Sequence, residues 1–219
     1  MSIKIYKMDP SPPARAVMML CDILKVPAEF VEVDIIHKKQ FEPEFLKINP
    51  LHTIPVLQDG DFVLHDSHTI LSYLVDVYGK DDSLYPKDVK KRALVNQKLL
   101  FNGTTLFPRL RSVTFQVVIK GNPNLSDTQL SDIEESYSFL ETFLSKTKYL
   151  AADNMTIADV AAIASVTTMV YIIPLDAKKY PKTKAWMEDM EKRSFCEKYN
   201  KPGTTFLGDV IQKAMNKKT

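Results

Sequence analysis

The chain has 219 residues, of which 45% are apolar and 26% are charged. This composition is typical of a compact folded protein and excludes a disordered, collagen-like or disulfide-framework chain. Twenty-nine Lys and Arg against 27 Asp and Glu leave a net charge of +2, and no basic block precedes the tail at 213–218. The charge pattern of a nucleic-acid-binding protein is therefore missing. We expect small molecules or proteins as partners, and no nucleic acid.

The two cysteines and the apolar stretches bear on location. The chain has only two cysteines, Cys21 and Cys196, which can make neither a disulfide framework nor a zinc site, and no metal is expected. The N-terminus meets Asp9-Pro10 before it can supply the apolar stretch of about 7 to 15 residues that a secretory signal needs. The longest uncharged stretch, 160–175, is shorter than the roughly 20 residues that cross a bilayer. We expect a reducing, cytoplasmic location and no membrane association.

The first 80 residues alternate between strand and helix patterns. Segments 3–7 and 31–35 alternate like strands, whereas the apolar residues of 14–24 recur at helical spacing. Proline is favoured at the first helical position, so the Pro-Pro pair after Ser11 places that serine at the helix N-terminus. Asp66 and Ser67 offer capping side chains to a later helix.

Three further patterns complete this half: a short helix at 41–48, a hairpin of strands 53–57 and 62–64, and a helix at 70–78. The predicted order is βαβαββα. The polar, turn-rich segment 80–86 predicts a linker between a first domain, 1–79, and a second domain, 87–219.

Only helical patterns follow the linker, at 87–120, 126–146, 156–171, 182–192 and, more weakly, 205–215. The second domain is therefore predicted to be all helical. Thr156 and Asp159 have the spacing of a capping box, with Met155 and Val160 placed as a hydrophobic staple around it. That helix is expected to be central and buried.

Ser11 is the first candidate for chemistry. The N–H groups of a first helical turn lack partners, and together with the helix dipole they stabilise an anion beside them. The hydroxyl could donate to such an anion, although for a lone Ser-Pro-Pro motif an ordinary N-cap is the more common explanation. A nucleophilic serine is unsupported, because no base lies near it in sequence. A redox role is not expected, because Ala14 stands where such an enzyme could place its cysteine, and Cys21 falls on the apolar helix face.

Two further segments could hold a ligand. Pro55 cannot donate to a sheet, and a cis bond before it would let Ile54 pair through its main chain with an extended peptide. An ordinary edge proline is the alternative. Asp66 could bind an ammonium group, and the helix N-terminus at Ser67 a carboxylate, although a simple cap is again the alternative. In combination, these groups predict a site for a small zwitterionic peptide that carries a thiol.

Segments 11–17, 49–57, 66–74 and 80–86 together resemble the cytosolic glutathione S-transferases, specifically the insect epsilon class and its delta relatives. Residues 156–159 match the folding motif of that family, and the resemblance covers almost the whole chain. It implies a thioredoxin-like α/β N-terminal domain, an all-α C-terminal domain, a homodimer, and glutathione as co-substrate.

The resemblance also implies roles for individual residues. Ser11 is the expected catalytic residue, which hydrogen-bonds the glutathione sulfur. The expected glutathione-binding residues are Gln40, His52, Thr53, Ile54, Pro55, Asp66, Ser67 and His68. His52 would contact the glycine end, Ile54 the cysteinyl unit, and Asp66 with Ser67 the γ-glutamyl end. Many epsilon members carry a histidine where this chain has Gln40, so we expect altered glycine-end contacts and retained binding.

The hydrophobic electrophile is expected on the helical half. Helical steps from Phe107 give a mainly apolar stripe with one cation, Arg111. The expected electrophile-binding residues are Pro12, Ile35, Phe107, Leu110, Arg111, Thr114 and Val118. The alternative is that the stripe belongs to the core or to a dimer interface.

The sequence thus predicts a glutathione transferase that ionises the glutathione thiol for attack on hydrophobic electrophiles, as in detoxification. Peroxidase, isomerase or dehydrochlorinase activity could use the same thiolate. A noncatalytic carrier of glutathione or hydrophobic ligands is the alternative. A glutaredoxin-like oxidoreductase is a third candidate, against which Ala14 counts.

Overall fold

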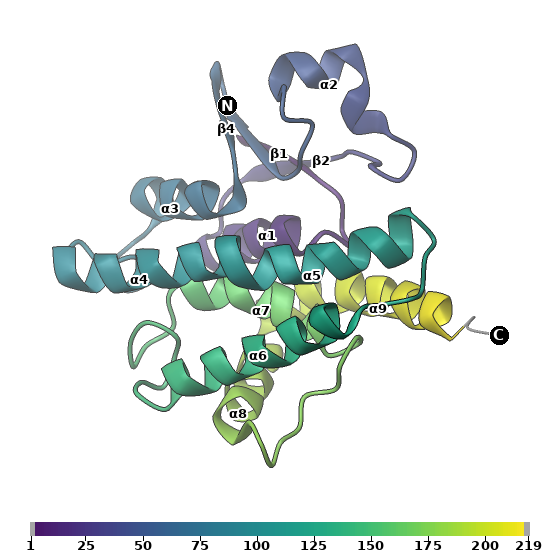
Figure 1. The fold of residues 1–219 in the computed structure, drawn as a ribbon. Coiled ribbons are helices and arrows are strands. Elements are labelled where there is room, and N and C mark those ends of the chain that lie inside the picture. The colour runs from purple at the N-terminus through teal and green to yellow at the C-terminus, as the bar shows by residue number, and fades with distance from the viewer. Residues whose placement is uncertain (1–2, 217–219) are drawn as a thin grey trace.

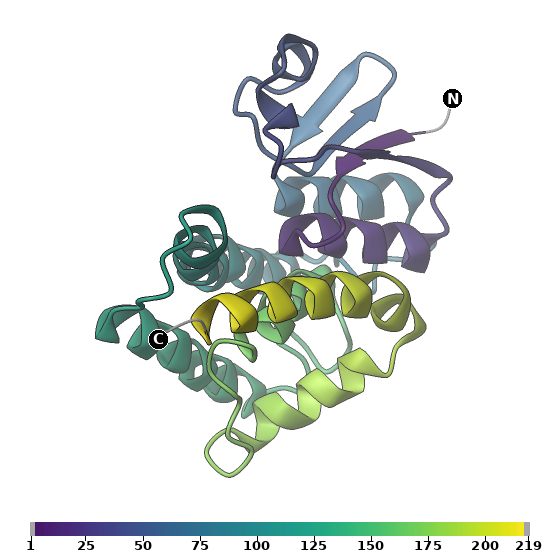
Figure 2. The same ribbon diagram turned by 90° about the vertical axis from the view of Figure 1, so that its right-hand side faces the viewer.

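The computed structural model describes residues 3–216, which form a sheet-containing N-terminal half and a helical C-terminal half (Figure 1). The sheet has the order β2-β1-β3-β4, and its strands are β1 (Ile3–Lys7), β2 (Ala28–Glu32), β3 (Val56–Asp59) and β4 (Phe62–His65). β1 and β2 are parallel, whereas β3 is antiparallel to both β1 and β4. The helices of this half are α1 (Pro12–Leu24), α2 (Pro43–Ile48) and α3 (Ser67–Tyr78). Figure 2 shows α1 and α3 side by side between the sheet and the helical half.

The predicted order βαβαββα is confirmed, but the bounds predicted for two of the strands were wrong. The segment predicted as a strand at 31–35 forms β2 only as far as Glu32, which pairs with Lys7, the last residue of β1. Beyond that point no partner strand continues, and Ile35 lies in a turn. The strand predicted at 53–57 begins only at Val56, because Pro55 has no N–H for the ladder.

The C-terminal half is all helical, as predicted. Its elements are α4 (Val89–Phe101), η2 (Asn102–Leu106), α5 (Phe107–Thr114), η3 (Phe115–Ile119), α6 (Asp127–Leu144), α7 (Ile157–Met169), α8 (Pro181–Glu191), η4 (Cys196–Asn200) and α9 (Lys201–Met215). The run from α4 to η3 is one long helical column that passes beneath the sheet (Figure 1), and η2 and η3 are π-helical turns within it. The weak pattern predicted at 205–215 is the later part of a helix that begins at Lys201.

No helix or strand lies between α3 and α4, where the linker is predicted. The domain boundaries themselves remain a prediction. One hydrophobic core extends through both halves, from Ile3 in β1 to Ile211 in α9. Within residues 3–216, no helix combines the length and the apolarity needed to span a membrane.

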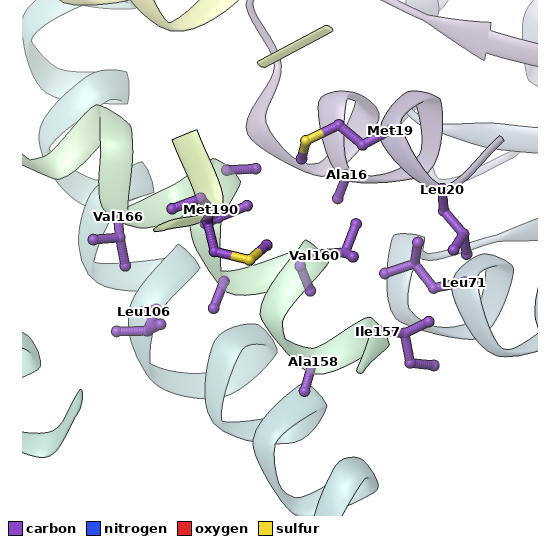
Figure 3. Packing of buried hydrophobic residues seen from close by; sticks show 14 of the residues in the cluster. Ala16, Met19, Leu20, Leu71, Leu106, Ile157, Ala158, Val160, Val166 and Met190 are labelled. Carbon is purple, nitrogen blue, oxygen red and sulfur yellow. The ribbon is translucent and has the colours of Figure 1, made fainter. Parts of the chain in front are cut away.

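Helix α7 is the centre of this core, as the capping-box spacing predicted. Every one of its residues is buried, and Figure 3 shows Ile157 and Val160 of α7 below Ala16 and Leu20 of α1. Burial raises the pKa of the Asp159 carboxyl, the acidic member of the capping box. This carboxylate accepts hydrogen bonds from the backbone N–H of Leu150 and Thr156, from the Thr156 hydroxyl and from the Trp186 indole. A buried charge is tolerated only with such partners.

Candidate active site

One edge of the sheet collects the segments that the sequence marked for ligand binding. Tyr6 lies opposite Val56, and Val56 lies opposite His65, so these three residues form one row across β1, β3 and β4. Ser11 follows the end of β1, Ile54 precedes the start of β3, and Asp66 follows the end of β4. The register of the sheet therefore brings Ser11, Ile54 and Asp66 to the same edge.

Ser11 occupies the N-cap position of α1, yet its side chain makes no capping hydrogen bond. A serine at this position ordinarily accepts from the N–H of the second or third helical residue. Here Pro12 and Pro13 have no N–H, so Ala14 carries the first one in the helix. The expectation of several free N–H groups in this turn was therefore wrong. Pro13 removes the donor at the second helical position, and the N–H of Ala14 at the third position does not donate to the Ser11 side chain. The half-buried hydroxyl of Ser11 therefore makes no cap and is available to a ligand.

The bond between Ile54 and Pro55 is cis, as the sequence suggested. Within residues 3–216 the N–H and C=O of Ile54 have no backbone partner, because β3 starts two residues later. The preceding turn is held by the buried Asn49, whose Nδ2 donates to the carbonyl oxygen of Thr53 at 2.9 Å and to its Oγ1 at 3.1 Å. The main chain of Ile54 thus lies at the same edge of the sheet, and its N–H and C=O are both free to pair with an extended peptide.

Asp66 has φ of 76° and caps α3, since its Oδ1 accepts from the N–H of His68 at 2.9 Å and of Thr69 at 3.1 Å. The hydrogen bond of the His68 side chain, together with the backbone N–H groups of Thr69 and His68, lowers the pKa of the Asp66 carboxyl to about 2. The side chain is 57% exposed, so Oδ2 can accept from a ligand ammonium group. Ser67 is buried at the first position of α3.

His68 joins this edge to the helical half. Its Nε2 lies 2.9 Å from Nδ2 of Asn102, and Oδ1 of Asn102 in turn accepts from the hydroxyl of Ser165 in α7. A β-carbon on Gly103 would come within 3.1 Å of the His68 ring, which shows how closely the helical column approaches α3. The sequence analysis did not predict Asn102 or Ser165 as site residues. The only feature that could have indicated them is that each is a polar residue within a mainly apolar helical pattern.

The residues expected at the glycine end of glutathione lie on neighbouring turns. Gln40 belongs to η1 (Lys39–Phe41), and the adjacent Phe41 packs its ring 4.7 Å from the ring of His52. His52 is exposed and has φ of 47°. The Oε1 atom of Gln40 is buried and has no hydrogen-bond partner among the described residues.

The electrophile stripe is only partly as predicted. Leu110 is 0% exposed and packs in the main core, so a ligand cannot reach it in this structure. Phe107 and Thr114 are half-buried, and Arg111 is exposed with its guanidinium 5.4 Å from the ring of Phe115. Phe115 itself is 39% exposed and was missed by the sequence analysis.

The remaining expected residues are placed as follows. Val118 packs against the main core, and Ile35 packs with Ile54 against the small cluster of Val33, Phe45 and Val56. Pro12 is buried at the start of α1. The stripe lies on the same helical column that contacts α3 through Arg92 and Asn102. No hydrogen bond found in residues 3–216 joins the stripe residues to the sheet edge.

Both cysteines are poor candidates for chemistry. Burial raises the pKa of the Cys21 thiol and of the Cys196 thiol to about 12 in each case, so both stay protonated at neutral pH. Residues 3–216 contain no group of three or more His, Cys, Asp or Glu side chains placed to hold a metal ion. A hollow of about 430 Å³ between the 144–153 segment and α8 contains none of the expected site residues.

Comparison with known proteins agrees with this arrangement. The family model for the glutathione S-transferase N-terminal domain matches residues 5–82, and the model for the C-terminal domain matches residues 108–194. Glutathione S-transferase 1 of Manduca sexta is 42% identical over 213 residues, which cover 96% of this chain and 98% of that protein.

Solved structures give the same result. Glutathione transferase E6 from Drosophila melanogaster superposes with a TM-score of 0.95 at 38% identity and covers 98% of both chains. An epsilon-class enzyme from the housefly, Musca domestica, has a TM-score of 0.95 at 39% identity and covers 97% of this chain and 98% of its own. A homologue from Drosophila mojavensis with bound glutathione has a TM-score of 0.95 at 38% identity and covers 97% of both chains.

The chain belongs to the glutathione S-transferase family. The resemblance to the insect epsilon and delta group is confirmed, as is the combination of a thioredoxin-like N-terminal half with an all-helical C-terminal half.

Proposed function

We propose that this protein binds glutathione at the sheet edge and ionises its thiol beside Ser11 for attack on hydrophobic electrophiles. The γ-glutamyl ammonium lies at Oδ2 of Asp66, and the γ-glutamyl carboxylate lies at Ser67 and the N-terminus of α3. The cysteinyl unit pairs with the main chain of Ile54 as an added strand. The glycine end lies toward Gln40, His52 and Thr53, with Pro55 and His68 shaping the wall.

The observation that carries this proposal is the uncommitted hydroxyl of Ser11 at the edge shared with Ile54 and Asp66. A free thiol with a pKa of about 8.5 is only a few per cent ionised at neutral pH, although the thiolate is the nucleophile. A hydrogen bond from Ser11 to the charged sulfur is worth about 1.5 to 3 kcal/mol, which lowers the thiol pKa by about one to two units. That shift makes a large share of the bound thiol reactive.

The electrophile contacts the accessible part of the stripe, which consists of the exposed Arg111 and the half-buried Phe107, Thr114 and Val118, with Pro12 and Ile35 nearer to the sulfur. Exposed apolar surface on this column favours hydrophobic compounds, and Arg111 attracts a polar substituent on them. The protein then supplies proximity, and the thiolate itself forms the new bond. Conjugation of this kind suits detoxification, and peroxidase, isomerase or dehydrochlorinase activity would use the same thiolate.

The experiment compares the parent protein with Ser11→Ala and Ser11→Thr in conjugation of a chromogenic aryl halide. Ser11→Ala is expected to raise the pKa of the bound thiol by about one to two units and to lower kcat at pH 6.5 by roughly tenfold or more, with glutathione affinity little changed. Ser11→Thr retains a hydroxyl and is expected to recover part of the activity. Equal turnover of parent and Ser11→Ala between pH 6 and 8 would remove Ser11 from this role.

The noncatalytic carrier gains no support, because the relatives at this level of similarity are named transferases. A carrier would bind glutathione and show no turnover of the aryl halide in the same assay.

We also propose a homodimer formed through β4, α3 and α4. The ring of Phe62 in β4 lies 5.3 Å from the ring of Tyr73 in α3, and Asp76 of α3 pairs with Arg92 of α4 at 3.2 Å, so β4 contacts α3 and α3 contacts α4. These elements expose large apolar side chains at Phe62, Val77, Val89, Leu94 and Leu100. Contiguous exposed apolar surface is typical of an interface. Light scattering should give twice the chain mass, and Leu100→Glu should shift the protein toward monomer.

For its location and organisation, we propose the cytoplasm and two domains, 1–79 and 87–219, joined by a linker at 80–86. The two unpaired thiols, Cys21 and Cys196, support a reducing compartment.

A further inference from the structure

The C-terminal helix α9 begins directly against the turn that carries Ser11. A β-carbon on Gly203 would lie 2.1 Å from the carbonyl oxygen of Asp9 and 2.8 Å from Cδ of Arg15. Real β-carbons do not approach other atoms this closely, so the contact exists only because residue 203 is glycine. Gly203, which follows Ser11 by about 190 positions in the sequence, thus contacts the main chain of Asp9, two residues before Ser11.

Arg15 holds the other side of the same contact. Its guanidinium is fully buried and donates to Oδ1 of Asn200 at 2.6 Å, to the carbonyl oxygen of Asn200 at 3.1 Å, and to Ala164 and Thr168 of α7. None of these acceptors is a carboxylate, and Nε has no partner among the described residues. The guanidinium of Arg15 is therefore held in place by hydrogen bonds to neutral oxygen atoms and not by an ion pair.

The turn itself is short and closed. The N–H of Ser11 donates to the carbonyl oxygen of Met8 at 3.0 Å, and the carbonyl oxygen of Ser11 accepts from the N–H of Arg15 at 2.9 Å. Any displacement of Asp9 or Arg15 is therefore passed to Ser11. The groups proposed to bind glutathione, Ile54 and Asp66, lie on other segments.

We propose that Gly203, together with Arg15 and Asn200, positions Ser11: the start of α9 fixes the angle at which the serine hydroxyl meets the glutathione sulfur. This inference rests on the function proposed above. Hydrogen bonds weaken steeply with distance and with misalignment. A small shift of the turn therefore raises the pKa of the bound thiol, while the contacts that determine glutathione affinity stay in place.

The test uses two matched substitutions on α9. Gly203→Ala presses on Asp9 and Arg15, whereas Gly208→Ala presses on the ring of Tyr171, from which its β-carbon would be 2.3 Å away. Both overpack the same helix, but only the β-carbon at position 203 has atoms of the Ser11 turn among its nearest neighbours. The readouts are the ultraviolet titration of the bound thiol, the pH profile of kcat for an aryl halide, and the dissociation constant of glutathione.

Gly203→Ala is expected to raise the thiol pKa by about one unit and to lower kcat at pH 6.5 by several-fold, with recovery above about pH 9. Its glutathione dissociation constant should change little. Gly208→Ala should leave the thiol pKa at the parent value, even where it lowers the melting temperature. An unchanged thiol pKa in Gly203→Ala, or an equal shift in both variants, overturns the proposal.

Asn200→Ala decides the question if Gly203→Ala does not fold. It removes the 2.6 Å bond to Arg15 without adding bulk, and it should shift the thiol pKa in the same direction; no shift overturns the proposal. Ser11→Ala is titrated in parallel. If Ser11→Ala raises the thiol pKa and the α9 and Asn200 variants do not, only the positioning role fails; if Ser11→Ala has no effect, the proposed function itself fails.

Discussion

Asn102 donates a hydrogen bond from its amide to Nε2 of His68 at 2.9 Å, across the boundary between the helical column and α3. Since an amide nitrogen only donates, Nε2 accepts and the proton of the neutral ring lies on Nδ1. That nitrogen is 3.4 Å from Oδ1 of Asp66. The helical half therefore orients the side chain that contributes most to lowering the pKa of the proposed ammonium-binding carboxylate.

Substitution of Asp66 should separate ligand binding from helix capping. Asparagine is as good an N-cap as aspartate, so Asp66→Asn should keep α3 intact while it removes the negative charge. Loss of one charge-assisted hydrogen bond, worth about 1.5 to 3 kcal/mol, should raise the glutathione dissociation constant by roughly 10- to 100-fold. Asp66→Ala should weaken binding similarly and also lower stability by about 1 kcal/mol through loss of the cap. Calorimetric titration and thermal unfolding measure the two effects; unaltered binding in both variants would exclude Asp66 from the site.

The lowered pKa of Asp66 has a consequence in acid. The folded-state pKa of about 2 lies below the ordinary value of 3.8, so the folded protein binds fewer protons at this carboxyl than the unfolded chain does. The stability that it contributes is fully present above about pH 4 and is lost as the pH falls toward about 2. The difference in unfolding free energy between the parent and Asp66→Asn should therefore shrink over that range. A difference that stays constant down to pH 2 would contradict the assignment.

The buried carboxylate of Asp159 should be important for stability. The carboxylate oxygens of Asp159 now accept from backbone N–H groups, a hydroxyl and the indole of Trp186. Asp159→Asn replaces one of these oxygens with an NH₂ group, which cannot accept. Such a change should cost roughly 2 to 4 kcal/mol of unfolding free energy, because buried donors lose their acceptor. Urea unfolding followed by the fluorescence of Trp186, the only tryptophan, measures it. Asp153→Asn is the control, since Asp153 is exposed and should change stability by less than about 0.5 kcal/mol.

The two cysteines should be chemically silent in the folded protein. With thiol pKa values of about 12 and buried sulfur atoms, Cys21 and Cys196 should resist alkylation at pH 8 and react only after unfolding. Cys21→Ala and Cys196→Ala should retain conjugation activity. Mass spectrometry after alkylation gives the answer, and disulfide reductase activity lost in either variant would instead support the glutaredoxin-like alternative.

Predictions from local patterns agreed best with the structure. The helices of both halves, the hairpin at 59–60, the capping box at Thr156 and the cis bond before Pro55 all depend on residues close together in sequence. Two of the errors occurred where a distant partner decides. β2 ends at Glu32 because β1 ends at Lys7, and Leu110 is buried because other helices cover its face.

The candidate site divides in the same way. The sequence by itself determined that Ser11, Ile54 and Asp66 would stand at element ends with groups to offer a ligand, because turn chemistry and helix capping act over a few residues. Only the tertiary structure decided that these ends share one edge, that the Ser11 hydroxyl makes no cap there, and that Gly203 supports the turn from the far end of the chain. Strand register and close packing join residues that are far apart in sequence, and a local pattern carries no record of such contacts.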